Sequence, residues 1–120
     1  MKYLCLIHTN PEVWARHSER EVDQLVSDHF EYDESLRKSG QMVTAWALQP
    51  PDSATIVRMR DGRISATDGP FAETKEEIGG FYLIEARDLN EAIQVAGNIP
   101  SARWGTVEVR PIRELVRPTL

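Results

Sequence analysis

His29 and Asp33 are separated by one helical turn, a spacing that places an imidazole beside a carboxylate. Val22, Leu25 and Leu36 follow helical spacing and bring His29 onto the inward side of the same helix. A carboxylate at this position would raise the pKa of the histidine and fix its tautomer, which suits a general base or acid. The pair also fits a half-buried histidine that is satisfied by its neighbour without any chemistry, so both interpretations stay open.

A second set of chemical groups follows the turn at residues 68–71, Asp-Gly-Pro-Phe. Glycine and proline preset backbone angles, and the aspartate can accept from the turn amides, so the segment fits a plain hinge between two strands. A rigid turn also holds functional groups well, which makes Asp68 a second candidate carboxylate for His29. Glu73 and Lys75 follow closely in the chain, and on this interpretation we assign them to ligand binding.

Three further side chains are candidates for contacting a ligand. His8 ends the first expected strand, where a ligand could reach it. Trp46 could line a pocket or belong to a core or interface, and Arg103 could hold a substrate carboxylate or be a surface charge. The histidines lack metal-ligand spacing and the chain has no glycine-rich phosphate-binding motif, so we expect neither a metal nor a cofactor.

Composition limits the class of protein. The chain has 120 residues, of which 41% are hydrophobic and 28% charged, as in an ordinary globular domain. Its net charge of −5 argues against nucleic acid as a direct partner, because a phosphate backbone requires a basic surface. No segment is long and apolar enough to cross a bilayer, and the start of the chain resembles a strand rather than a leader. A single cysteine, Cys5, precludes an intrachain disulfide and favours a cytoplasmic location.

Local signals predict the elements that carry these residues. Ser18 and Glu21 form a capping box and Gly40 supplies a left-handed stop, so the first helix is expected at residues 19–39. Asp88 caps a second helix that ends at residues 99–100, Ile-Pro. Asp-Gly at residues 61–62 joins two β-rich runs within residues 54–67 as a tight hairpin. The remaining strands are expected at residues 3–7, 42–48, 80–86 and 106–112.

The order of these elements predicts the fold. It is β-α-β, a hairpin, then β-α-β, which gives an α+β fold of the ferredoxin-like split βαβ type with an inserted β-hairpin. We expect a single domain over residues 1–112 and a C-terminal extension over residues 113–120.

Two strands are apolar on both sides, although two helices can cover only one face of a four-stranded sheet. In the first strand, one side carries Tyr3, Cys5 and Ile7 and the other carries Leu4 and Leu6. In the second strand, alternation sets Met42, Trp46 and Leu48 against Val43, Ala45 and Ala47. The uncovered face therefore needs a partner, and we predict a homodimer with its two sheets packed face to face.

The segment "DGPFAETKEEIGGFYLIEA" resembles the signature of the YCII-related family, in the branch often called DGPF-domain proteins. The segments "MKYLCLIH", "LQPPDSATIVRMRDGR" and "IPSARWGTVEVRPI" agree, so the resemblance covers nearly the whole chain. It implies a dimeric α+β barrel built from ferredoxin-like halves. Some YCII-type relatives are enzymes that act on small ring compounds, one of them by removing chloride from a chlorinated hydroxyquinol. Proteins of the DGPF branch often accompany extracytoplasmic-function sigma factors, which implies regulation.

The resemblance also implies site residues. Such enzymes are thought to use a histidine on the first helix, which falls on His29, and an aspartate before a proline, which falls on Ile99 in this chain. Our leading hypothesis is a cytoplasmic dimer that binds a small molecule without a cofactor. His29 would act as general base or acid in isomerisation or elimination, oriented by Asp33 or Asp68.

Two alternatives are kept beside this hypothesis. One is a non-catalytic binding or regulatory module that acts with a sigma factor, whose basic surface would meet Glu73, Glu76 and Glu77. The other is a dimeric scaffold without a surviving site.

Overall fold

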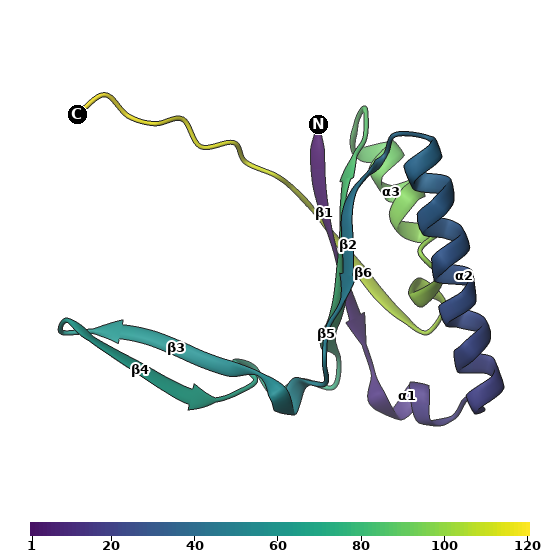
Figure 1. Ribbon diagram of the computed structural model, residues 1–120, viewed down its shortest axis with the longest axis horizontal. Helices are drawn as coiled ribbons and strands as arrows, with labels where there is room; N and C mark the ends of the chain where they lie inside the picture. The colour runs from purple at the N-terminus through teal and green to yellow at the C-terminus, as the bar shows by residue number, and fades with distance from the viewer.

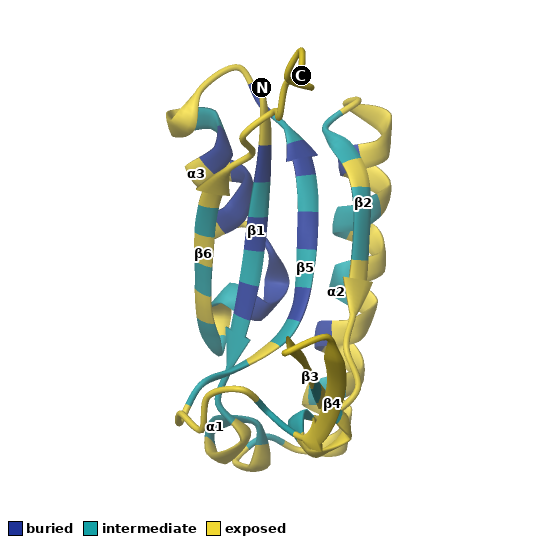
Figure 2. Ribbon diagram, turned by 90° about the vertical axis from the view of Figure 1, so that its left-hand side faces the viewer, coloured by how far each residue is buried: buried dark blue, intermediate teal, exposed yellow.

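A computed structural model describes all 120 residues and contains a four-stranded antiparallel sheet in the order β2-β5-β1-β6. The central strands are β1 (Lys2–Thr9) and β5 (Glu77–Glu85), and the outer strands are β2 (Met42–Ala47) and β6 (Gly105–Pro111). Figure 2 looks onto the face of this sheet that no helix covers, which we call the open face. The strand order is that of a ferredoxin-like fold, so the predicted split βαβ arrangement is confirmed.

All helices lie on the other face of the sheet (Figure 1). They are α1 (Pro11–Ala15), α2 (Glu19–Lys38) and α3 (Leu89–Gly97), with the short 3-10 segment η2 (Pro100–Arg103). A second 3-10 segment, η1 (Pro51–Ser53), follows β2 and lies on the open side. None of the helices combines the length and the apolar composition that crossing a bilayer requires.

The capping signals act as the sequence predicted. The backbone N–H of Glu21 donates to the Ser18 hydroxyl oxygen at 3.1 Å, and the N–H of Ser18 donates to the Glu21 carboxylate at 3.0 Å. Gly40 has a φ of +77° directly after the helix, where a residue with a Cβ would be strained. Asp88 accepts from the backbone N–H of Glu91 at 2.9 Å and thereby starts α3.

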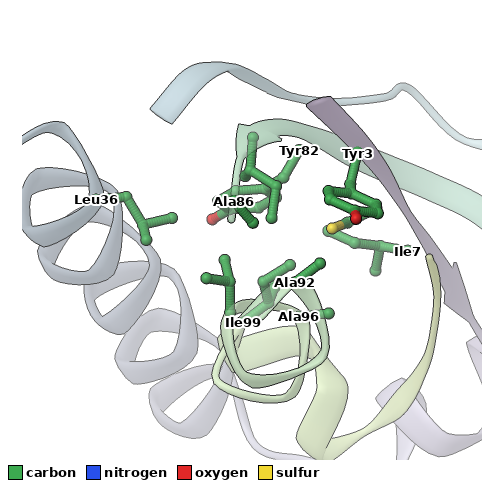
Figure 3. Close-up of a cluster of buried hydrophobic side chains, with 11 residues drawn as sticks. Tyr3, Ile7, Leu36, Tyr82, Ala86, Ala92, Ala96 and Ile99 are labelled. Atoms are coloured by element: carbon green, nitrogen blue, oxygen red, sulfur yellow. The ribbon is translucent and has the colours of Figure 1, made fainter. Parts of the chain in front are cut away.

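The core lies between the sheet and the helices. Figure 2 shows buried residues alternating along β1 and β5, and Figure 3 shows helix side chains meeting those strands. Cys5 and Ile84 are fully enclosed, and burial raises the pKa of the Cys5 thiol to about 11. Ile99, at the position where the family resemblance places an aspartate, is only 1% exposed and belongs to this core.

Two local features differ from the sequence prediction. No helix was predicted before residue 19, but Asn10 accepts from the N–H of Glu12 at 3.0 Å and starts α1 with Pro11 at its first position. Strand β5 begins at Glu77 rather than residue 80, because the chain continues pairing with β1 beyond a bulge next to Ile7.

The side-chain alternation predicted for β2 was wrong. A bulge between Met42 and Thr44 shifts the register, so Met42 pairs with Ile84 while Trp46 pairs with Phe81. One extra residue reverses which face each later side chain occupies. Met42 therefore packs against the core, and Trp46 is 68% exposed on the open face.

The predicted hairpin is confirmed and forms a separate two-stranded sheet of β3 (Thr55–Arg60) and β4 (Arg63–Asp68). Its turn residues Asp61 and Gly62 both have positive φ, at 52° and 73°, as a tight primed turn requires. The hairpin and the exposed chain after β6 both project from the open face (Figure 1).

The capping box provides the first test of the fold. We expect Ser18→Ala to lower the free energy of unfolding by about 1 kcal/mol, because it leaves an N–H of the first turn without its acceptor. Urea unfolding monitored by circular dichroism measures the change. Ser27→Ala, at an exposed position of α2, is the matched control and should leave stability unchanged or slightly increased. Equal stability of the wild type and Ser18→Ala would contradict the assigned role of the cap.

Candidate functional site

His29 has hydrogen-bond partners at both ring nitrogens. Its Nδ1 lies 2.8 Å from the hydroxyl oxygen of Tyr82, and its Nε2 lies 2.6 Å from the hydroxyl oxygen of Ser101. Tyr82 in turn donates its hydroxyl hydrogen to the carboxylate of Asp33. The four side chains form one continuous chain, Asp33–Tyr82–His29–Ser101, and come from α2, β5 and η2.

This connectivity fixes the tautomer of the histidine. A tyrosine hydroxyl has a single hydrogen, and the ionised carboxylate of Asp33 can only accept it. The Nδ1 of His29 must then donate its hydrogen to the Tyr82 oxygen, which leaves the lone pair of a neutral imidazole at Nε2. Ser101 must donate to that lone pair. The order of donors is therefore Ser101 to His29 to Tyr82 to Asp33.

Burial keeps this chain of groups uncharged except at its carboxylate end. Tyr82 is 3% exposed and Ser101 is 6% exposed, whereas His29 is half-buried. Burial is the main cause of a lowered His29 pKa, and it outweighs Asp33, which acts in the opposite direction. The carboxylate of Asp33 therefore acts on the His29 pKa in the predicted direction, but burial is the larger effect. Burial and the bond to Asp33 raise the pKa of Tyr82, so its hydroxyl stays protonated.

An ion pair and an aromatic cluster lie beside these residues. Arg103, in the same short segment as Ser101, donates to Asp28 at 2.7 Å, and this bond lowers the Asp28 pKa. Asp28 directly precedes His29 in α2, and the positive charge of Arg103 helps to lower the pKa of His29. Trp104 stacks on His17 with ring centroids 3.7 Å apart.

The remaining predicted residues gather on the opposite side of the sheet. A groove of about 630 Å³ at the base of the hairpin is lined by His8, Pro70, Phe71, Glu76, Ile78 and nine other residues. His8 Nε2 lies 3.0 Å from a carboxylate oxygen of Glu108. Glu73 and Lys75 are exposed in the loop beside this groove, and Trp46 stands exposed on the same open face.

The structure therefore separates the candidates into two groups. His29, Asp33 and Arg103 lie on the helix side, whereas His8 and the groove lie on the open face. Asp68 was the alternative to Asp33 as the carboxylate that orients His29, but it ends β4 at the base of the projecting hairpin (Figure 1), where it pairs with Thr55. Within one chain Asp68 does not orient His29; Asp33 acts on it through Tyr82.

Sequence reasoning missed Tyr82 and Ser101. Tyr82 shares the inward face of β5 with Ile84, and a tyrosine buried among apolar residues needs a hydrogen-bond partner. The sequence could therefore have predicted a polar side chain next to the Tyr82 hydroxyl. Ser101 had no comparable signal, because its bond to His29 spans 72 positions of the chain. The structure contains no group of three His, Cys, Asp or Glu side chains that could hold a metal ion.

Comparisons with known proteins give a family, one relative and one similar structure. A family model described as the YCII-related domain matches residues 1–116. An uncharacterised protein of Rhizobium meliloti (strain 1021) is 32% identical over 114 residues, which cover 93% of this chain and 92% of that protein.

One similar solved structure is 5-chloro-2-hydroxyhydroquinone dehydrochlorinase of Burkholderia phenoliruptrix AC1100, in complex with 2,5-dihydroxybenzoquinone. The two folds superpose with a TM-score of 0.53 over 94% of each chain, at 17% sequence identity. At that identity the likeness establishes a shared fold.

The pKa of His29 tests the hydrogen-bonded chain. We expect NMR titration to give His29 a pKa below that of an ordinary histidine, because burial disfavours its charged form. Asp33→Asn should lower this pKa further, since it removes the charge that favours the imidazolium. Asp23→Asn, at an exposed position of α2, should leave the His29 titration unchanged. A His29 pKa that rises or stays constant in Asp33→Asn would refute the proposed coupling.

Proposed function

The chain belongs to the YCII-related domain family, and from this premise we propose that it binds a small molecule and performs acid–base chemistry at His29 without a cofactor. The single observation that supports this proposal is the hydrogen-bonded order Ser101 to His29 to Tyr82 to Asp33. A base whose lone pair meets a hydroxyl, and whose other nitrogen is oriented by a further group, is the arrangement that proton transfer requires.

The proposed step follows from these bonds. Ser101 passes its proton to Nε2 of His29, and the serine oxygen takes a proton from an activated carbon or hydroxyl of the substrate. The positive charge that forms on the imidazole is offset through Tyr82 by Asp33. In an elimination the electron pair left on carbon expels the leaving group, and in an isomerisation His29 returns a proton at another carbon through Ser101.

We propose a small ring compound with acidic hydroxyl or carboxyl groups as the substrate class. The similar solved structure acts on a chlorinated hydroxyhydroquinone by its name, which supports this class by analogy alone. Arg103 adds support, because its ion pair with Asp28 places its positive charge beside the residue that precedes His29. Ligand contacts by His8, Trp46, Glu73 and Lys75 stay predictions, and of these four residues only His8 lines the groove on the open face.

We also propose that the chain is a homodimer with sheets packed through their open faces. Trp46 is exposed there, and its neighbours Leu4, Leu6, Phe81 and Leu83 are only half-buried within one chain. A second copy offers the same apolar surface, so packing the two open faces together would bury both of them.

The regulatory alternative stays a prediction, as do membership of the DGPF branch and a cytoplasmic location. The sigma-factor hypothesis relies on three acidic side chains. Only Glu73 is fully exposed, whereas Glu76 and Glu77 are half-buried, and Glu76 accepts a hydrogen bond from Thr106.

A thermal-shift screen with ring acids and quinols tests the site. A compound that binds the native state raises its melting temperature. We expect a stabilising compound to lose its effect on His29→Ala and His29→Gln but to keep it on His8→Ala, whose side chain lines the groove on the open face. Stabilisation that survives both His29 substitutions would exclude His29, and its loss in His8→Ala alone would place the ligand on the open face.

Sedimentation at low micromolar concentration tests the dimer. We expect the wild type to sediment as a dimer and Leu6→Glu to sediment as a folded monomer, because a charge on the open face opposes burial there. Phe30→Glu changes an equally apolar but exposed residue of α2, on the helix side, and should remain dimeric. A well-folded wild-type monomer under these conditions would disprove the proposal.

A further inference from the structure

The β3–β4 hairpin has one apolar face that nothing in its own chain covers. Val57 pairs with Ala66 and Met59 pairs with Ile64, so these four side chains share a face. Val57 is 63% exposed, Met59 55% and Ile64 72%. The other face carries the pair Arg58 and Ser65 and the pair Arg60 and Arg63. Two-stranded hairpins are marginally stable alone in water, so an apolar face of this kind is expected to pack against something.

The direction of the hairpin identifies what covers it. It leaves the open face of the sheet rather than lying along it (Figure 1). Six residues of strand extend about 20 Å, whereas sheets that pack face to face lie about 10 Å apart. If a second copy packs on the open face, the hairpin is long enough to extend past the sheet of that copy. The outer half of the hairpin would then lie along the side of the second copy.

We propose that the hairpin is an arm with which each copy clasps the other, burying Val57, Met59, Ile64 and Ala66 against its partner. This proposal rests on the homodimer proposed above and adds the surface that holds it. In a symmetric dimer both arms act together, because each copy offers the same patch and the same receiving flank.

The arm also affects the groove at its base. That groove opens on the same side of the sheet and is lined by His8, Phe71 and Ile78. A partner held between the two arms would cover it, so the groove would be complete as an enclosed site only in the dimer. A ligand that occupies it would consequently favour association of the two copies.

Substitutions on the arm test the clasp. The double variant Met59→Ser with Ile64→Ser should raise the dimer dissociation constant by on the order of 100-fold, because two apolar side chains would no longer be buried on association. Sedimentation measures this constant, and circular dichroism checks that the fold is retained. Phe30→Ser removes a comparably exposed apolar side chain from α2 and should leave the constant unchanged.

A second measurement needs no variant. Trypsin should cleave the wild type after Arg58, Arg60 or Arg63 when it is diluted below the dissociation constant, and cleave slowly above it. An unchanged dissociation constant in the double variant, or equal cleavage at both concentrations of a wild type that dimerises, would overturn the arm alone. A wild type that is monomeric throughout would overturn the proposed dimer and the arm together.

Discussion

The structure of this protein depends on a sheet that is covered by helices on one face and left uncovered on the other. Every helix lies on one face, where Tyr3, Cys5 and Ile7 are buried, while Leu4 and Leu6 of the same strand turn to the uncovered side. Burial of apolar surface away from water is favourable, so the covered face stabilises the single chain, and the open face is the surface that the proposed dimer would bury. The projecting hairpin and C-terminal segment lie around that second face.

The polar chain through His29 is part of the packing of the covered face. Tyr82 lies in the apolar core next to Ile84, and a buried hydroxyl without a partner costs about 1–3 kcal/mol. Its bonds to Asp33 and His29 remove that cost and simultaneously orient the imidazole. The hydrogen bonds that satisfy the buried Tyr82 hydroxyl are the same bonds on which the proposed chemistry at His29 depends.

The sequence predicted correctly those features that depend on interactions between residues close together in the chain. The Ser18 cap and the Asp61-Gly62 turn depend on neighbours within a few residues, and both were predicted correctly. The bulge after Met42 and the bond between His29 and Ser101 depend on residues far away in the chain, and neither was foreseen. His29 and Asp33 were selected correctly as neighbours on a helix, but Tyr82, which joins them, comes from a strand 49 positions beyond Asp33.

Cys5 is enclosed at the centre of the sheet, and its raised pKa keeps the thiol protonated in neutral solution. Alkylating reagents and oxidants react with the thiolate, so this sulfur is chemically silent while the fold is intact. The folded native chain consequently offers no reactive thiol to a labelling reagent. A single cysteine introduced on the surface would take up a fluorophore or spin label without first removing the natural one, and a reaction at Cys5 would report directly that the sheet had opened.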